Sequence, residues 1–137
     1  MITQKSAMLL CLDLEQGSRA LAQYGAELAG KCDQNIHLFY VEPSKGSHVI
    51  KDPRACLASL AEEALKGVTV EAIELRRGIA EDEIIAYAAR CDIAPIVIGR
   101  RQRSAVERIY VGSTTSAVLS LAACPVLVVP LGGEDIR

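Results

Sequence analysis

The sequence has very few aromatic residues. Its 137 residues include no tryptophan, one phenylalanine and four tyrosines. Proteins that bind single-stranded nucleic acid stack the bases on aromatic side chains, and this chain offers few of them. The charge points the same way, because 15 Lys and Arg against 17 Asp and Glu leave a formal net charge of −2. A basic surface is typical of nucleic-acid-binding proteins, so no nucleic-acid partner is expected.

Signals for cysteine pairing are also missing. The five cysteines, at positions 11, 32, 56, 91 and 124, are odd in number and widely spaced, and none belongs to a CxxC motif. A disulfide framework and a zinc site are both disfavoured. Cys11, Cys91 and Cys124 stand in or beside apolar runs, which predicts small core residues. Unpaired cysteines fit a reducing compartment, and the first residues lack the apolar segment of a signal peptide, so we expect a cytoplasmic protein.

One long segment carries no charge. Residues 109–133 contain no Asp, Glu, Lys or Arg, and a segment of that length could span a bilayer. It nevertheless contains several Ser and Thr residues, followed by Pro125 and Pro130. Proline has no N–H and restricts the residue before it, so Pro125 should end a helix. The segment is therefore predicted to form a short helix and a buried strand, and no membrane partner is expected.

Two kinds of apolar pattern alternate along the chain. Short apolar runs predict five strands, at Met8–Leu12, Ile36–Val41, Val68–Leu75, Pro95–Ile98 and Val126–Val129. Apolar residues on one helical face predict four helices, at Ser18–Lys31, Pro53–Lys66, Ala80–Cys91 and Ser113–Ala123. In the last of these, Leu121 is among the residues expected to face the core. Strands separated by helices form right-handed crossovers, so residues 1–137 are expected to be one doubly wound α/β domain. Its five-stranded parallel sheet should have the order 3-2-1-4-5, with two helices on each face.

Ligands of such sheets bind outside the carboxyl ends of the strands. Asp13, Val41 and Gly99 fall at predicted strand ends, and a polar segment then leads to a helix that opens at Gly112 and Ser113. Backbone N–H groups at a helix N-terminus form a natural anion site, to which hydroxyl groups in the first turn could add hydrogen bonds. The alternative is that Ser113 only caps the helix.

The chain resembles the universal stress protein family over nearly its whole length. The resemblance rests on the Asp after the first strand, on the order of elements and on the segment from Gly112 to Pro130, which reads GST, then AVL, then CPVLVVP. Nucleotide-binding members carry a spaced motif of two glycines followed by Gly-Ser or Gly-Thr. This chain matches the motif at Gly99, Gly112 and Ser113, and departs from it at the second glycine, where Gln102 stands.

The resemblance implies an adenine-nucleotide site for ATP or AMP, with Mg²⁺ only where ATP binds. Asp13 would hydrogen-bond the ribose or the base edge, and the backbone of Val41 would meet the adenine. Gln102 replaces a glycine that lets the backbone approach the phosphates, which puts full ATP binding in question. The remaining positions are Ile98 and Gly99 beside the ribose and phosphates, and Gly112, Ser113 and Thr114 at the β- and γ-phosphates.

The last predicted strand also indicates a partner. Val126–Val129 would form an edge of the sheet, and an apolar edge invites pairing with another chain. A twofold pairing of this strand with itself would be antiparallel and self-complementary, and the family commonly dimerises in this way. We therefore expect a homodimer through Val126–Val129.

Three functions remain open at this stage. The first is a dimeric stress-response protein that binds adenine nucleotide. The second is a dimeric protein of the same fold that acts by protein contacts alone. The third is an enzyme of the related adenine-nucleotide hydrolase fold, for which the sequence offers no nucleophile elbow, P-loop lysine or metal cluster. Asp13 by itself is a poor ATPase signature, because an Asp after a strand can simply satisfy the N–H groups of the following loop.

Overall fold

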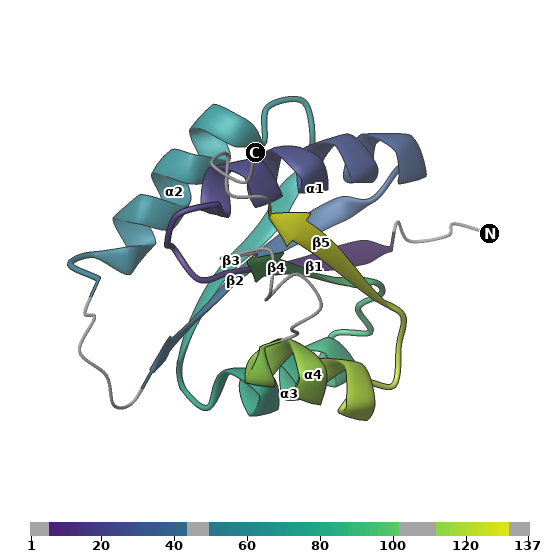
Figure 1. Ribbon diagram of the computed structural model, residues 1–137. Coiled ribbons are helices and arrows are strands. Elements are labelled where there is room, and N and C mark those ends of the chain that lie inside the picture. Colours follow the sequence, from purple (N-terminus) through teal and green to yellow (C-terminus); the bar gives the residue numbers. More distant parts are fainter. Residues whose placement is uncertain (1–5, 44–49, 102–111, 132–137) are drawn as a thin grey trace, which may run out of the picture.

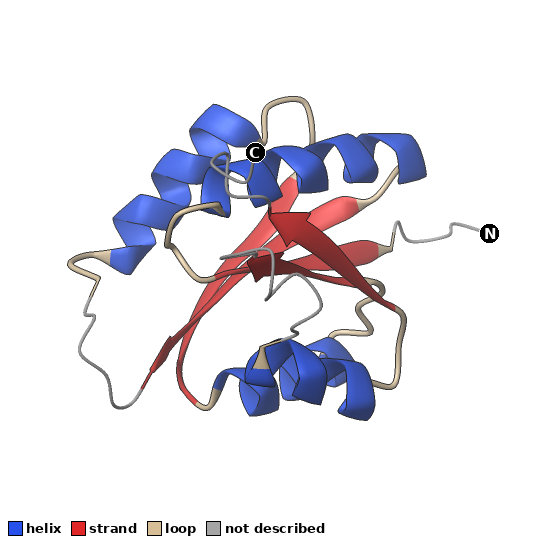
Figure 2. Cartoon of the chain, viewed as in Figure 1, coloured by secondary structure: helices blue, strands red, loops and turns tan. Residues whose placement is uncertain are grey.

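The computed structural model describes residues 6–43, 50–101 and 112–131 (Figures 1 and 2). Five parallel strands stand in the order β3-β2-β1-β4-β5, which confirms the predicted sheet. The strands are β1 (Ala7–Leu12), β2 (Asn35–Pro43), β3 (Val70–Gly78), β4 (Ile96–Arg101) and β5 (Val126–Leu131). The helices are α1 (Ser18–Cys32), α2 (Pro53–Ala64), α3 (Ala80–Arg90) and α4 (Ser113–Leu121).

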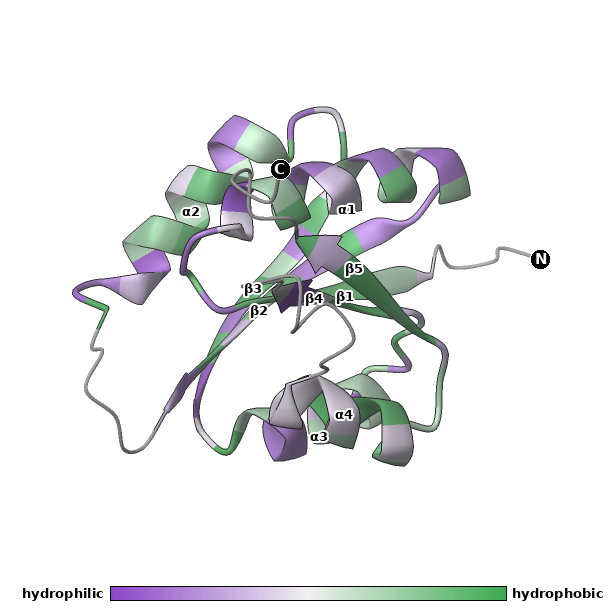
Figure 3. Ribbon diagram, in the orientation of Figure 1, coloured by the Kyte–Doolittle hydropathy of each residue, from purple (hydrophilic) through white to green (hydrophobic). Residues whose placement is uncertain are grey.

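Two helices cover each face of the sheet. In Figure 1, α1 and α2 lie above the sheet and α3 and α4 below it. The central strand β1 is buried along its whole length, and its residues alternate between two hydrophobic clusters. Met8, Leu10 and Leu12 pack beneath α1 and α2, in what we call the α1/α2 cluster. Leu9 and Cys11 pack against α3 and α4, in the α3/α4 cluster. A strand buried on both faces reads as a continuous apolar run, which is the green band of β1 in Figure 3.

Local sequence features explain where α2 and α3 begin and how closely α1 packs against the sheet. The side chain of Asp52 accepts a hydrogen bond from the Ala55 N–H (3.2 Å), and Pro53 follows as the first residue of α2. The first turn of α3 carries three acidic residues, which the helix dipole favours. Gly25 lets α1 approach β1, because an added methyl group there would lie 3.0 Å from both Leu10 methyl carbons.

Several strand boundaries differ from the prediction. β3 begins at Val70 because the chain first turns at Gly67, whose φ of +85° lies in the left-handed region. Three further strands are longer than predicted: β2 continues to Pro43, β4 to Arg101 and β5 to Leu131. The continuous apolar runs are shorter than these strands, because residues near the end of a strand lie at the margin of the core and need not be apolar.

Two residues expected in the core are exposed. α4 ends at Leu121, whose side chain is 61% exposed, and Cys91 follows the last residue of α3 and is exposed as well. Both residues stand at the C-terminal end of a helix, and helical periodicity alone does not show whether neighbouring elements still cover a side chain there. None of the helices in the three described ranges combines the length and apolar character that crossing a bilayer requires.

Candidate functional site

The parallel register brings Asp13 and Val41 to the same end of the sheet. Leu12, the last residue of β1, pairs with Tyr40 of β2, so Asp13 and Val41 follow at one level. Val41 was predicted to be the last residue of its strand. That prediction was wrong, because β2 continues to Pro43. The half-buried Val41 side chain packs against the α3/α4 cluster.

Ile98 and Gly99 lie on the other side of β1. Ile98 is buried and pairs with Cys11, so Gly99 reaches the level of the end of β1. The Thr115 hydroxyl, in the first turns of α4, donates a long hydrogen bond of 3.5 Å to the Gly99 carbonyl. This contact brings the start of α4 beside the end of β4, across 16 residues of sequence.

Asp13 organises the loop that follows β1. Its Oδ1 atom accepts hydrogen bonds from the Glu15 N–H (2.9 Å) and from the Ser18 hydroxyl (3.2 Å). Leu14 adopts a left-handed φ of +60°, and Gly17 one of +104°. Such positive φ values make a tight turn, which the Asp13 carboxylate stabilises as an Asp side chain does when it bonds to N–H groups of its own loop.

Among the described residues, no side chain caps the start of α4. Gly112 is the N-cap residue, so the alternative that Ser113 serves as the cap is wrong. The Ser113 side chain is exposed and that of Thr114 is half-buried. A methyl group added at Gly112 would meet no described atom within 4 Å, so nothing in the described fold requires glycine at this position. Gln102 lies outside the described residues.

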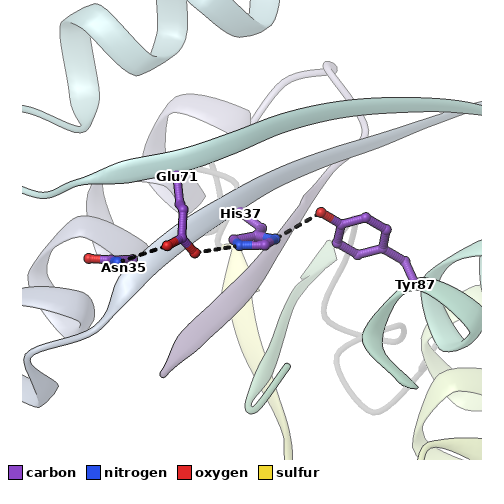
Figure 4. Close-up of polar contacts among 4 residues, drawn as sticks. All are labelled: Asn35, His37, Glu71 and Tyr87. Atoms are coloured by element: carbon purple, nitrogen blue, oxygen red, sulfur yellow. Dashed lines mark hydrogen bonds and ion pairs between the residues drawn. The ribbon is translucent and has the colours of Figure 1, made fainter. Parts of the chain in front are cut away.

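A second polar cluster lies between β2, β3 and α3 (Figure 4). His37 Nε2 lies 2.8 Å from Glu71 Oε1, and His37 Nδ1 lies 2.8 Å from the Tyr87 hydroxyl. The Asn35 side chain donates to the other Glu71 oxygen at 3.3 Å. Because an ionised carboxylate only accepts, Nε2 donates to Glu71, and the Nδ1 of a neutral imidazole then accepts from Tyr87. We call these four residues the His37 network.

An irregularity in β3 positions Glu71 in this network. Ile36 pairs with Val70 whereas His37 pairs with Ala72, so Glu71 is one extra residue in the ladder, as in a β-bulge. The hydrogen bond from His37 lowers the pKa of the Glu71 carboxyl below its usual value. Burial is the main cause that raises the pKa of Tyr87 to about 12.

The described residues contain one further feature near Asp13. An open groove of about 590 Å³ lies between the β1–α1 loop and α2, and an Arg19–Glu63 ion pair joins α1 to α2 beside it. Within the described ranges, no three His, Cys, Asp or Glu side chains come together in a way that could hold a metal ion.

The sequence interpretation missed Ser18, Thr115 and the His37 network. Ser18 stands five residues after Asp13, a spacing that could have suggested their contact. The network offered no such signal, because His37 is separated by 34 residues from Glu71 and by 50 from Tyr87.

Comparison with known proteins identifies the family. The family model "Universal stress protein family" matches residues 6–130. A curated relative, universal stress protein MJ0531 of Methanocaldococcus jannaschii, is 29% identical over 124 residues, covering 79% of this chain and 72% of the relative.

Solved structures share the fold. The hypothetical protein MJ0577 superimposes with a TM-score of 0.75 at 18% identity, covering 93% of this chain and 97% of the other. A universal stress protein in complex with cAMP gives a TM-score of 0.72 at 14% identity, covering 94% and 99%. UspA from Lactobacillus plantarum gives 0.65 at 22% identity, covering 93% and 99%. With its sheet order, its helices and the match across residues 6–130, this chain belongs to the universal stress protein family.

Proposed function

We propose that this chain is a stress-response protein that binds an adenine nucleotide at the carboxyl end of its sheet. The observation that carries the proposal is the start of α4, where no described atom crowds Gly112 and Ser113 is exposed. Asp13 and Val41 lie at the same end of the sheet, and Gly99, which contacts Thr115 of α4, reaches the level of the end of β1 on its other side. All five cysteines are free, which fits a cytoplasmic protein.

The residues at this end suit the parts of a nucleotide. The first N–H groups of a helix have no acceptor within the helix, and they attract phosphate together with the helix dipole. Gly112 adds no side chain that would block the approach, and Ser113 and Thr114 carry hydroxyl groups. A carboxylate accepts several hydrogen bonds, so Asp13 can receive a ribose hydroxyl in addition to its contacts with the loop. The cAMP complex of a protein with the same fold supports an adenine nucleotide as the ligand.

The proposal is tested by binding. Mass spectrometry of protein purified without added ligand reports a nucleotide carried through purification, and calorimetry with ATP, AMP and cAMP measures affinity. Asp13→Ala should weaken binding without unfolding the protein, whereas Asp82→Ala, an exposed carboxylate in the first turn of α3, should leave it unchanged. Wild-type protein that binds none of the three nucleotides would contradict the proposal.

A second function is favoured by the loop after β1. The Asp13 carboxylate already serves Glu15 and Ser18, so its presence has a reason within the fold. The second candidate is therefore a protein that acts through protein contacts alone. It predicts that the folded wild-type protein gives no binding heat with nucleotides in calorimetry. It also predicts that Asp13→Ala captures protein partners as well as the wild type does.

We propose that the protein works as a homodimer through Val126–Val129. β5 is an edge strand, and half-buried apolar side chains occupy most of it. The Ile96 N–H donates to the Pro125 carbonyl, so the parallel ladder turns the N–H groups of Val126 and Val128 outward. Val128→Pro would remove an outward N–H and should yield a monomer in light scattering, where wild type gives the dimer mass. A monomeric wild type at micromolar concentration would contradict the dimer.

A further inference from the structure

Two glycines of different segments face one leucine. Leu131, the last residue of β5, is half-buried against the α1/α2 cluster. A methyl group added at Gly99 would lie 2.6 Å from Leu131 Cδ1, and one added at Gly17 would lie 3.2 Å from the same atom. Non-bonded carbons pack at about 3.5–4.0 Å. The Leu131 side chain thus occupies space that only glycine leaves open at both positions.

Both glycines belong to segments of the candidate site. Gly17 is the N-cap residue of α1, and the next residue, Ser18, donates its hydroxyl to Asp13. Gly99 offers its carbonyl to Thr115 at the start of α4. Leu131 therefore contacts the turn that orients Asp13 and the strand end that contacts α4.

The side on which Leu131 packs is informative. The same added methyl at Gly99 would also lie 3.3 Å from Leu21 Cδ2, in α1. The side of Gly99 on which a side chain would stand therefore faces α1, away from α4. Packing against Leu131 and Leu21 explains glycine at this position, and the approach of a ligand is not needed to explain it.

We infer that Leu131 is a positioning residue of the nucleotide site, acting through Gly17 and Gly99. The inference rests on the proposed function. Removing the Leu131 side chain leaves a space between the β1–α1 turn and the end of β4. The turn then gains freedom to move, and Asp13 moves with it because Ser18 and Glu15 hold its carboxylate. The loss should appear in nucleotide affinity beyond any loss of stability.

The test compares the same truncation at two edges of the sheet. Leu131→Ala and Leu75→Ala each shorten a half-buried leucine of the α1/α2 cluster, one in β5 and one in the opposite edge strand β3. Calorimetry with AMP should show affinity about fivefold or more weaker in Leu131→Ala, and unchanged in Leu75→Ala at a similar loss of thermal stability. Leu131→Met, which fills the same space with an unbranched apolar side chain, should keep most of the affinity that Leu131→Ala loses.

A second readout needs no nucleotide. In nuclear magnetic resonance spectra of the full chain, Leu131→Ala should shift the amide signals of Gly17 and Ser18, and Leu75→Ala should not. Gly99→Ala should cost less stability in the Leu131→Ala background than in wild type, because the clash with Cδ1 is gone.

The two readouts separate the inference from the function on which it rests. Equal AMP affinities in Leu131→Ala and Leu75→Ala, or unshifted Gly17 and Ser18 signals, would overturn the role of Leu131. If wild type binds no nucleotide while these signals shift as expected, the proposed function fails and the positioning of the Asp13 turn by Leu131 stands.

Discussion

The His37 network and the carboxyl end of the sheet satisfy their polar groups in opposite ways. In the network, Asn35, Glu71, His37 and Tyr87 bond to one another across two strands and a helix. At the carboxyl end, Ser113 is exposed and no atom of the described residues crowds Gly112. None of the buried side-chain nitrogen or oxygen atoms in the described residues lacks a hydrogen-bond partner, so the fold leaves polar groups open only where solvent reaches them.

The comparison separates stability from binding. Tyr87 is buried and stacks on Phe39 with ring centres 4.8 Å apart, while the guanidinium of Arg76 lies 5.3 Å from the Tyr87 ring centre. Changes in this cluster should alter the free energy of unfolding and leave ligand affinity alone. Changes at the start of α4 should do the reverse.

The largest effect is expected from Tyr87→Ala. Loss of the buried ring, together with the partner of His37 Nδ1, should reduce the free energy of unfolding by about 3–5 kcal/mol in urea titrations. Tyr24→Ala is the control, because this helical tyrosine is 41% exposed; it should change stability by less than about 0.5 kcal/mol. If Tyr87→Ala does not fold, Tyr87→Phe should still lower stability by about 1–3 kcal/mol. Equal stabilities of the Tyr87 and Tyr24 variants would contradict the conclusion that the His37 network contributes to stability.

Gly112→Val should show the opposite pattern. The added side chain occupies the open space at the start of α4, and losing a charge-assisted hydrogen bond there corresponds to roughly tenfold to hundredfold weaker ATP binding. Unfolding should change by no more than about 1 kcal/mol, the cost of a poorer N-cap. Gly30→Val, at a second glycine with no atom within 4 Å of an added methyl, should not affect binding. Unchanged ATP affinity in Gly112→Val would move the site elsewhere.

Gln102→Gly sharpens the description of the phosphate end. Gln102 stands where the motif of the family's nucleotide-binding members, which the sequence resembles, has a glycine, and a glutamine side chain there would take up phosphate volume or constrain the backbone. The variant should bind ATP about tenfold more tightly, with a smaller change for AMP, in calorimetric titrations. The competing possibility is that the Gln102 amide donates a hydrogen bond to a phosphate oxygen. Weaker ATP binding in the variant would establish that contact.

The smallest effect concerns the acid stability of the network. The His37 hydrogen bond lowers the pKa of Glu71, so the stabilisation is present above the ordinary glutamate value of 4.5 and is lost as the pH falls through the lower, folded-state value. The difference in urea midpoint between wild type and Glu71→Gln should therefore shrink below pH 4.5. Its size should be modest, because half of the Glu71 side chain is exposed. A difference that grows on acidification would contradict the assignment.

The fold could be predicted largely from local patterns. Continuous apolar runs and one-sided helical stripes depend on neighbours within a few residues, and they suffice for the order of elements and for a parallel sheet covered by helices. The same patterns misplaced Cys91 and Leu121, because they do not say whether another element covers the end of a helix. Asp13 and Gly112 could be singled out for a related reason, since a strand end and a helix start are both visible along the chain.

Other features depended on contacts between segments far apart in the sequence. The irregularity that makes Glu71 an extra residue in the ladder is a matter of register between two strands, and no local pattern encodes it. Likewise, Gly99 looks like a ligand-binding glycine in the sequence, whereas its neighbours in space are Leu131 and Leu21. Sequence determines which side chains each segment offers; only the packing of the segments determines which of them occupy the same few ångströms, because that depends on the position of every strand in the sheet.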